Sequence, residues 1–230
     1  SPISIRLNPR KKSLQFETEE VVTWCPDGRY LKERPSFTLD PLFHAGTYYP
    51  QEAGSMYIDA IVRSIELPEN PVSLDLCAAP GGKSLLCAYK LKETGLLVSN
   101  DRSAARRARI HKIFDEYIPK TKQANHKVTG HDATKWCLYE KSVYDRVLLD
   151  APCSSERHVL EDAKELSLWS VGRTKAIAMT QFAMLASALD IVKVGGRIVY
   201  STCALSKLEN DDIIRKLYQK REGRFELKRM

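Results

Sequence analysis

The chain has 230 residues, of which 43% are hydrophobic and 28% are charged, so it can bury one sizeable core. It contains no apolar run near the roughly 20 residues that a membrane-spanning helix needs, which argues against an integral membrane protein. The net charge of +7 and the pI near 9.0 suit a polyanionic partner such as nucleic acid, but a merely basic protein explains them equally well. Because the chain starts at Ser1 without a methionine, we expect a piece of a longer protein.

The six cysteines are dispersed along the chain, without a CxxC pair or the histidine spacing of a zinc site. This pattern favours free thiols in a reducing compartment over a disulfide framework. We therefore expect a cytoplasmic protein, or a mitochondrial or nucleolar one if the source is eukaryotic. No metal is expected, and the lack of a histidine-rich ligand set disfavours a metal-dependent hydrolase.

Residues 1–50 differ in pattern from the rest of the chain. Short β-rich runs at residues 3–7 and 21–24 are broken by proline and glycine. We expect a small N-terminal extension of strands and loops over residues 1–50. A catalytic domain over residues 51–230 follows, and it opens with an amphipathic helix at residues 51–65.

From residue 70 onward, predicted strands alternate with predicted helices. The strands are expected at residues 72–76, 96–99, 126–129, 144–149 and 197–200. The helices are expected at residues 83–91, 103–117, 174–192 and 208–219, and a loop-like insertion precedes the third of these. Repeated βα units predict an α/β fold with a mostly parallel, doubly wound, Rossmann-like sheet.

Ligands of such sheets bind outside the carboxyl ends of the strands, and unusual residues gather there in this sequence. The first predicted strand leads into a turn made of Cys77, Ala78, Ala79, Pro80, Gly81, Gly82 and Lys83. Two glycines at a strand-to-helix turn let a ligand approach the backbone and the helix N-terminus. The spacing matches neither the dinucleotide fingerprint nor the phosphate loop, and a plain tight turn is the alternative.

Two further carboxylates follow the next two strands. Asp101 can accept hydrogen bonds from the ribose hydroxyls of an adenosine-containing cofactor, or it can cap the helix that begins near Ser103. Arg106 lies one turn into that helix and either pairs with Asp101, approaches the ligand or is simply solvated. Asp132 can contact an adenine amino group or stabilise its own turn.

The ends of the fourth and fifth strands carry the residues with the strongest chemical signal. Asp150 follows a buried apolar run, and Cys153 comes three residues later. Cys203 ends the fifth strand in the same way. Two thiols beside a carboxylate on one edge of a sheet indicate nucleophilic chemistry, whereas either thiol alone reads as a buried structural cysteine.

A thiolate suits methylation at carbon 5 of cytosine, a carbon that is a poor nucleophile. Addition of the thiolate at carbon 6 makes carbon 5 enamine-like, so that it can attack an electrophilic methyl group. Loss of the carbon 5 proton and departure of the thiol restore the ring. A carboxyl such as Asp150 near ring nitrogen 3 would stabilise the adduct, and the base must leave any stack to be reached.

Together these segments resemble the Sun/RsmF (NSUN) family of RNA 5-methylcytosine methyltransferases, and in particular its bacterial ribosomal RNA enzymes. The likeness covers roughly residues 35–220. The matching segments are YYPQEAGSM at 48–56, DLCAAPGGK at 75–83, Asn100-Asp101, DAPCS at 150–154, YSTCALS at 200–206 and Glu209-Asn210.

The resemblance implies a Rossmann-like methyltransferase whose cofactor is S-adenosylmethionine, with S-adenosylhomocysteine as product. It implies that residues 77–83 hold the methionine part, that Asp101 and Arg106 lie at the ribose, and that Asp132 lies at the adenine. It places Asp150 between the cofactor and the target base, with Lys83 among both the catalytic and the cofactor-binding residues. The resemblance alone makes Cys203 the nucleophile and Cys153 the residue that helps to release the product.

The expected partner is RNA, with ribosomal RNA ahead of transfer RNA and no role for a membrane. A non-catalytic, methyltransferase-like RNA-binding assembly factor is the alternative from another class, against which both cysteines, Lys83 and Asp150 argue. Many relatives carry additional RNA-binding domains. Substrate selection is therefore expected to depend on an accessory domain or a partner protein.

Overall fold

The structure is a computed structural model that describes residues 2–91, 93–123, 125–156 and 170–228. Most of the insertion predicted before the third helix lies outside these residues. The chain divides into two compact units, Ser1–Leu74 with Ala78–Gly130 and Asp75–Cys77 with His131–Met230. No helix in the described part of the chain is long and apolar enough to cross a membrane.

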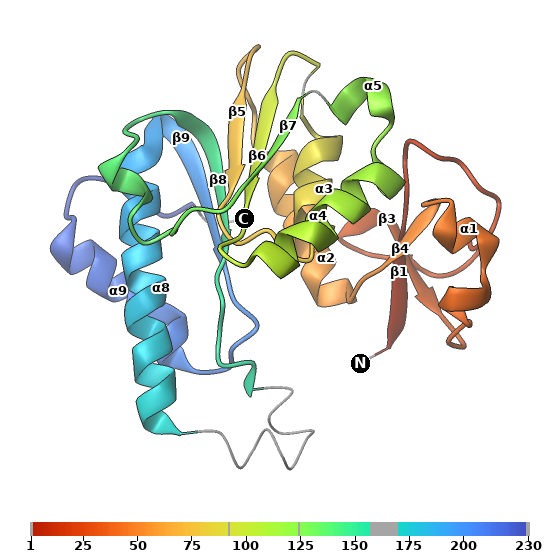
Figure 1. Ribbon diagram of the computed structural model, residues 1–230. Coiled ribbons are helices and arrows are strands. Elements are labelled where there is room, and N and C mark those ends of the chain that lie inside the picture. Colours follow the sequence, from red (N-terminus) through yellow and green to blue (C-terminus); the bar gives the residue numbers. More distant parts are fainter. Residues whose placement is uncertain (1, 92, 124, 157–169, 229–230) are drawn as a thin grey trace. The chain divides into compact units, whose positions relative to one another are not determined.

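Strands and helices alternate through most of the chain (Figure 1). The strands are β1 (Ile3–Leu7), β2 (Val21–Val22), β3 (Cys25–Leu31), β4 (Tyr48–Pro50), β5 (Val72–Asp75), β6 (Leu96–Asn100), β7 (His126–Thr129), β8 (Tyr144–Asp150) and β9 (Val192–Ser201). The helices are α1 (Pro41–His44), α2 (Ala53–Ser64), α3 (Gly82–Tyr89), α4 (Ala104–Tyr117), α5 (Lys120–Gln123), α8 (Val171–Ile191) and α9 (Asp211–Lys220). Short 3-10 helices lie at Phe37–Leu39, Trp136–Leu138 and Lys207–Glu209.

The N-terminal residues form a four-stranded sheet in the order β2-β3-β1-β4, in which β1 runs antiparallel to β3 and β4. One side chain cluster joins this sheet to α2 through Val22, Cys25, Ala53 and Met56. The strand expected at residues 3–7 is confirmed. Strands β3 and β4 were not predicted, because Pro26 and Gly28 interrupt the apolar pattern of β3 and β4 has only three residues.

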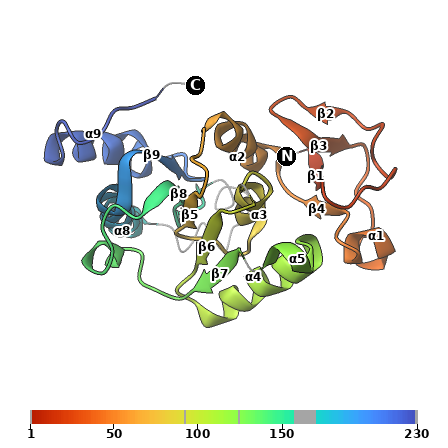
Figure 2. The same cartoon turned by 90° about the horizontal axis from the view of Figure 1, so that it is seen from above.

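The second sheet has the strand order β7-β6-β5-β8-β9, which can be followed in Figure 2. The pairs β6/β7 and β8/β9 are parallel. Within this sheet, the first strand along the chain is the central strand β5. The next strands, β6 and β7, lie on one side of β5, and β8 and β9 lie on the other side. Strand order therefore reverses between β5 and β8, the topological switch point at which such sheets bind ligands. The predicted α/β, Rossmann-like fold is confirmed.

Helices α8 and α9 lie near β8 and β9 within the second unit (Figure 1). Helix α8 begins at Val171, three residues before the predicted start, because the Ser170 hydroxyl accepts a hydrogen bond from the backbone of Arg173 and caps it. Helix α9 begins at Asp211 instead of residue 208, since Lys207–Glu209 forms a separate 3-10 turn.

Strand β9 begins five residues before its predicted start. Its register against β8 shifts between the pairs Tyr144–Val192 and Arg146–Arg197. Gly195, with φ of +80°, and Gly196 lie within this irregular stretch. The glycine pair therefore produces a bulge inside the strand and not the turn that was expected to precede it.

Candidate functional site

The predicted glycine turn connects β5 to α3. Gly81 has φ of +121°, a backbone conformation that side chains with a Cβ rarely adopt. A Cβ on Gly82 would lie only 2.7 Å from Cε1 of Tyr49, so no larger residue fits there. Both the tight-turn alternative and a ligand-binding loop require glycine at these two positions.

The N-terminal sheet supports this turn through Arg6, which is 1% exposed. Its Nη2 donates a hydrogen bond of 3.0 Å to the carbonyl oxygen of Gly82. Its guanidinium also lies 5.8 Å and 5.7 Å from the ring centroids of Tyr49 and Tyr89. Sequence reasoning missed this role, although an arginine in the middle of an apolar strand was a usable signal.

Asp101 is almost fully buried at the end of β6 and makes two contacts with α4. Its Oδ1 accepts a hydrogen bond of 2.9 Å from the backbone N–H of Ser103, and its Oδ2 lies 3.3 Å from Nε of Arg106. The helix cap is Ser103, whose hydroxyl accepts from the backbone of Arg106, so Asp101 itself does not cap α4. Nη2 of Arg106 also donates to the carbonyl of Ala79 at 3.0 Å and so links the glycine turn to Asp101.

Asp132 follows β7 and contacts its own turn. Its Oδ1 accepts hydrogen bonds from the backbone N–H of Thr134 at 3.0 Å and from the Thr134 hydroxyl at 2.7 Å. The sequence offered two roles for Asp132, stabilising its own turn or contacting an adenine amino group, and these hydrogen bonds are of the first kind. The two roles are compatible, because a carboxylate has two acceptor oxygens.

The remaining residues of the predicted cofactor loop divide between the two units. Lys83 is half-buried in the first turn of α3. Cys77 lies at the start of the turn, where its Sγ is 3.9 Å from Sδ of Met184 on α8. Cys77 thus contacts a partly buried side chain of its own unit.

The most distinctive feature of the second unit is a pair of free thiols. Sγ of Cys153 lies 2.6 Å from Sγ of Cys203, although the two residues are 50 positions apart in sequence. The Ser155 hydroxyl lies 3.8 Å from each sulfur. Cys203 is exposed and Cys153 is half-buried, so a reactant can reach the pair from solvent. The structure thus brings together the two thiols that the sequence placed at strand ends.

Asp150 lies beside this pair at the end of β8. It stands opposite Ser201 of β9, and its Oδ1 accepts a hydrogen bond of 2.7 Å from the Ser201 hydroxyl. Its negative charge makes a small contribution to raising the pKa of Cys203. A carboxylate and two thiols are therefore gathered at the ends of two neighbouring parallel strands.

The two thiols have opposite shifts in acidity. The pKa of Cys153 is lowered to about 6, chiefly because its thiolate accepts the hydrogen bond of the Cys203 thiol. The same hydrogen bond raises the pKa of Cys203 well above its usual value, with burial and the charge of Cys153 adding to the effect. At neutral pH the pair therefore carries one thiolate and one proton, with the thiolate on Cys153 in the resting arrangement.

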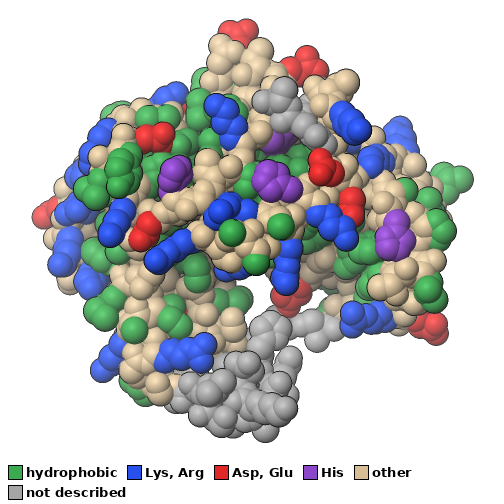
Figure 3. Space-filling view, in the orientation of Figure 1, with side chains coloured by type: hydrophobic (Ala, Val, Ile, Leu, Met, Phe, Trp, Pro, Cys, Tyr) green, Lys and Arg blue, Asp and Glu red, His purple; other side chains and the backbone are tan. Residues whose placement is uncertain are grey.

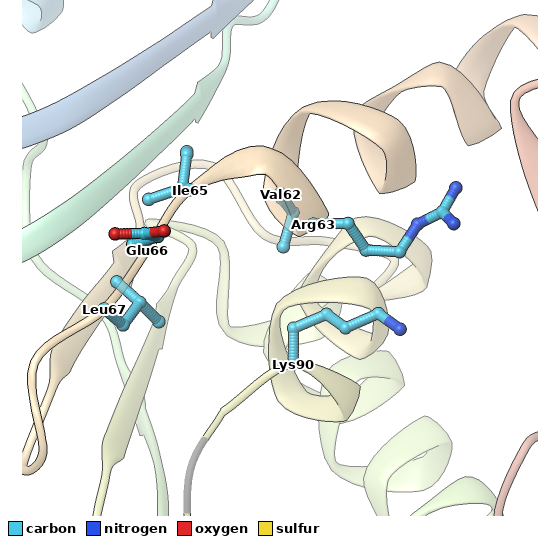
Figure 4. A pocket seen from close by; sticks show the side chains of 6 residues that line it. All are labelled: Val62, Arg63, Ile65, Glu66, Leu67 and Lys90. Atoms are coloured by element: carbon cyan, nitrogen blue, oxygen red, sulfur yellow. The ribbon is translucent and has the colours of Figure 1, made fainter.

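A separate pocket lies at the end of α2, lined by Val62, Arg63, Ile65, Glu66, Leu67 and Lys90 (Figure 4). None of the predicted site residues lines it, and it presents no nucleophile. Among the residues that the structure describes, no group of three His, Cys, Asp or Glu side chains is placed to hold a metal ion. The thiol pair in the second unit and the Gly81-Gly82 turn in the first remain two candidate functional features.

The Rossmann-like sheet carries a glycine turn after β5 and paired thiols after β8 and β9. These features define the class of this protein as a Rossmann-like methyltransferase fold. A profile of the family described as "16S rRNA methyltransferase RsmB/F" matches residues 62–229, and a profile of the "N-terminal domain of 16S rRNA methyltransferase RsmF" matches residues 1–53. The chain belongs to the 16S rRNA methyltransferase RsmB/F family, as the resemblance of its motifs implied.

Individual relatives agree with this assignment. The chain is 37% identical over 174 residues to the 5-cytosine rRNA methyltransferase NSUN4 of Xenopus laevis, covering 74% of this chain and 42% of that protein. It is 36% identical over 223 residues to the ribosomal RNA small subunit methyltransferase F of Shewanella sediminis, covering 91% and 46%. The crystal structure of NSun6 from Pyrococcus horikoshii with SFG superposes with a TM-score of 0.67 at 31% identity, covering 85% and 47%. The chain spans less than half the length of the two curated relatives.

Proposed function

We propose that this chain is the catalytic part of an enzyme that transfers a methyl group from S-adenosylmethionine to carbon 5 of a cytosine in ribosomal RNA. The observation that carries the proposal is the 2.6 Å approach of the Cys153 and Cys203 thiols beside Asp150. Family membership supports it, as do the names of relatives that act on ribosomal RNA cytosines.

Most of the residues that suit the proposed cofactor belong to the first unit, whereas Cys77 and Asp132 belong to the second. The glycine turn at the N-terminus of α3 offers backbone groups without side chains to an amino-acid moiety, and Asp101 on the adjacent strand offers a carboxylate for the ribose. SFG, found with the similar Pyrococcus protein, is an analogue of S-adenosylmethionine. We propose that residues 77–83, Asp101, Arg106 and Asp132 bind S-adenosylmethionine, which supplies an electrophilic methyl group and is released as S-adenosylhomocysteine.

Replacing Asp101 with asparagine should weaken binding of S-adenosylmethionine by about 10- to 100-fold, because a hydrogen bond to a charged group contributes roughly 1.5–3 kcal/mol. Asparagine keeps one oxygen for the Ser103 N–H but loses the charge that faces Arg106. Calorimetric titration measures the affinity, with Asp115→Asn on the exposed face of α4 as the control. Equal affinity of the Asp101 variant and the original protein would exclude Asp101 from the ribose site.

The second unit supplies the groups for the reaction itself. One proton transfer between the paired sulfurs moves the negative charge from Cys153 to Cys203, whose exposed thiolate then adds to carbon 6 of the cytosine. A proton held between Asp150 and ring nitrogen 3 offsets the negative charge that forms in the ring when the sulfur adds. After methylation, Cys153 releases to solvent the proton that it took from Cys203, and its thiolate then accepts the carbon 5 proton. Departure of the Cys203 sulfur as a thiolate restores the ring, and proton transfer from Cys153 back to Cys203 restores the resting pair.

A basic surface is consistent with an RNA substrate. Lysine and arginine side chains are spread widely over the face shown in Figure 3, in keeping with the net charge of +7. Part of the basic helix α4 is engaged within the protein, since Arg107 donates to the carbonyls of Asp101 and Arg102. We propose that residues 1–50 form an N-terminal extension to a catalytic domain at residues 51–230, and that an accessory domain or partner selects the RNA.

Incubating the protein with methyl-labelled S-adenosylmethionine and unmodified 16S ribosomal RNA should give 5-methylcytosine at one site. Bisulfite sequencing then identifies the modified nucleotide. Unmodified transfer RNA is the parallel substrate. Labelling of transfer RNA alone would overturn the ribosomal assignment, and cofactor binding without labelling of either RNA would overturn the enzymatic one.

A further inference from the structure

The loops that carry the two thiols are both held by one dipeptide, Glu209-Asn210. Glu209 ends the 3-10 turn Lys207–Glu209, and Asn210 directly precedes α9, near α8 in the second unit. Neither side chain touches a sulfur atom. Instead, Glu209 makes hydrogen bonds to the loop that carries Cys153, and Asn210 makes hydrogen bonds to the loop that carries Cys203.

Glu209 holds the loop that carries Cys153. Its carboxylate is 0% exposed and accepts a hydrogen bond of 3.0 Å from the backbone N–H of Ser154 and another from the Ser154 hydroxyl. The buried amide of Gln181, on α8, donates to the same carboxylate at 2.8 Å and to the carbonyl of Pro152 at 2.8 Å. Both neighbours of Cys153 are thereby anchored to one buried carboxylate.

Asn210 holds the loop that carries Cys203. Its Oδ1 accepts a hydrogen bond of 2.7 Å from the Thr202 hydroxyl, and its Nδ2 donates to the carbonyls of Ala204 and Ser206 at 3.0 Å and 2.9 Å. Cys203 is thus flanked by two residues that Asn210 contacts directly.

A buried carboxylate is costly unless hydrogen bonds satisfy it, and Glu209 meets that cost with neutral donors from the Cys153 loop and α8. Because the two anchors are adjacent in the backbone, the hydrogen bonds that hold the two loops are linked through a single planar peptide bond. We propose that Glu209 and Asn210 are positioning residues that hold the Cys153 and Cys203 thiols in hydrogen-bond contact. The positioning role itself is independent of the proposed function, and only its effect on methyl transfer rests on that function.

The test is the pH dependence of thiol alkylation by iodoacetamide, mapped by mass spectrometry, which needs neither RNA nor cofactor. In the original protein, alkylation of the pair should rise as pH increases through about 6, because the Cys153 thiolate is present above its lowered pKa and protonated below it. In Glu209→Gln, an amide nitrogen replaces one carboxylate oxygen. That nitrogen faces hydrogen-bond donors and cannot accept from them. The loop should move, and the midpoint should rise by at least about one pH unit toward the ordinary thiol value of ~8.5.

Asn210→Asp retains the acceptor for Thr202 but loses both donated hydrogen bonds, and it should shift the midpoint in the same direction. Ser154→Ala, which removes one donor and leaves the charge of Glu209 in place, should give a smaller upward shift and serves if Glu209→Gln does not fold. Asp211→Asn makes the same acid-to-amide change at the exposed neighbouring position and should leave the midpoint near 6. An unchanged midpoint in folded Glu209→Gln, or in Ser154→Ala and Asn210→Asp together, would overturn the proposal.

Methyl transfer supplies the second readout. The turnover of Glu209→Gln should fall by about 10- to 100-fold while its affinity for S-adenosylmethionine stays unchanged, because misplacement of a reacting group by about 1 Å costs roughly that much. If the original protein methylates no RNA, the proposed function fails while the alkylation result still decides whether the dipeptide positions the thiols. Normal turnover in Glu209→Gln, with an active original protein, would contradict the positioning role.

Discussion

Replacing Cys203 with alanine should reduce methyl transfer by about 10⁴-fold or more and abolish any covalent protein–RNA species. The expected loss is large because the adduct at carbon 6 is what makes carbon 5 reactive, and removal of a covalent nucleophile leaves only binding and orientation. The measurements are methyl incorporation from labelled cofactor and a protein–RNA band that survives denaturing electrophoresis.

A matched control is Cys137→Ala, which removes a half-buried thiol elsewhere in the same unit. This variant should keep full activity. If the Cys203 variant still formed a covalent RNA species, the nucleophile would be Cys153, whose thiolate carries the charge of the resting pair.

Replacing Cys153 with alanine should give the opposite pattern, an accumulated covalent protein–RNA species with turnover reduced by about 10²- to 10⁴-fold. Without Cys153, the step that removes the carbon 5 proton loses its assisting group, so the adduct forms but resolves slowly. Its formation should depend on S-adenosylmethionine, because release is impaired only after the methyl group has been transferred.

The pH of this experiment matters. Cys153→Ala removes the hydrogen-bond partner that contributes most to raising the pKa of Cys203, so the pKa of the remaining thiol should fall toward the ordinary value of ~8.5, with burial and Asp150 still holding it above that value. The assay is therefore run at about pH 9, where more of the Cys203 thiolate is present than at neutral pH. The double variant Cys153→Ala/Cys203→Ala is the control and should form no covalent species. Absence of the species in Cys153→Ala alone would remove the proposed role in product release.

Much of the fold could be predicted because it depends on local pattern. Apolar runs of strand length alternated with helical periods from residue 70 onward, and this order specifies parallel strands joined by crossover helices. The misplaced boundaries have local causes as well. Ser170 extends α8 toward its N-terminus, and the Gly195-Gly196 pair is absorbed into a bulge of β9.

The candidate site was only partly predictable. Residue types at strand ends pointed to Cys153, Cys203 and Asp150, since the sheet places those ends on one edge. Their roles came from resemblance to a family and remain proposals. Arg6 and Gln181 gave only a weak signal, because each lies in an element that carries other polar residues.

The sequence by itself determined the order of strands and helices, the glycine turn and the family, because each of these is written in residues close together along the chain. Only the tertiary structure decided that two sulfurs 50 positions apart lie 2.6 Å from each other and that Ser103, not Asp101, caps α4. It also decided that a buried Glu209 anchors the loop of Cys153. The cap depends on the local backbone geometry before α4. The other contacts join distant segments, and such pairings depend on how strands align and helices pack, which the spacing of residues does not encode.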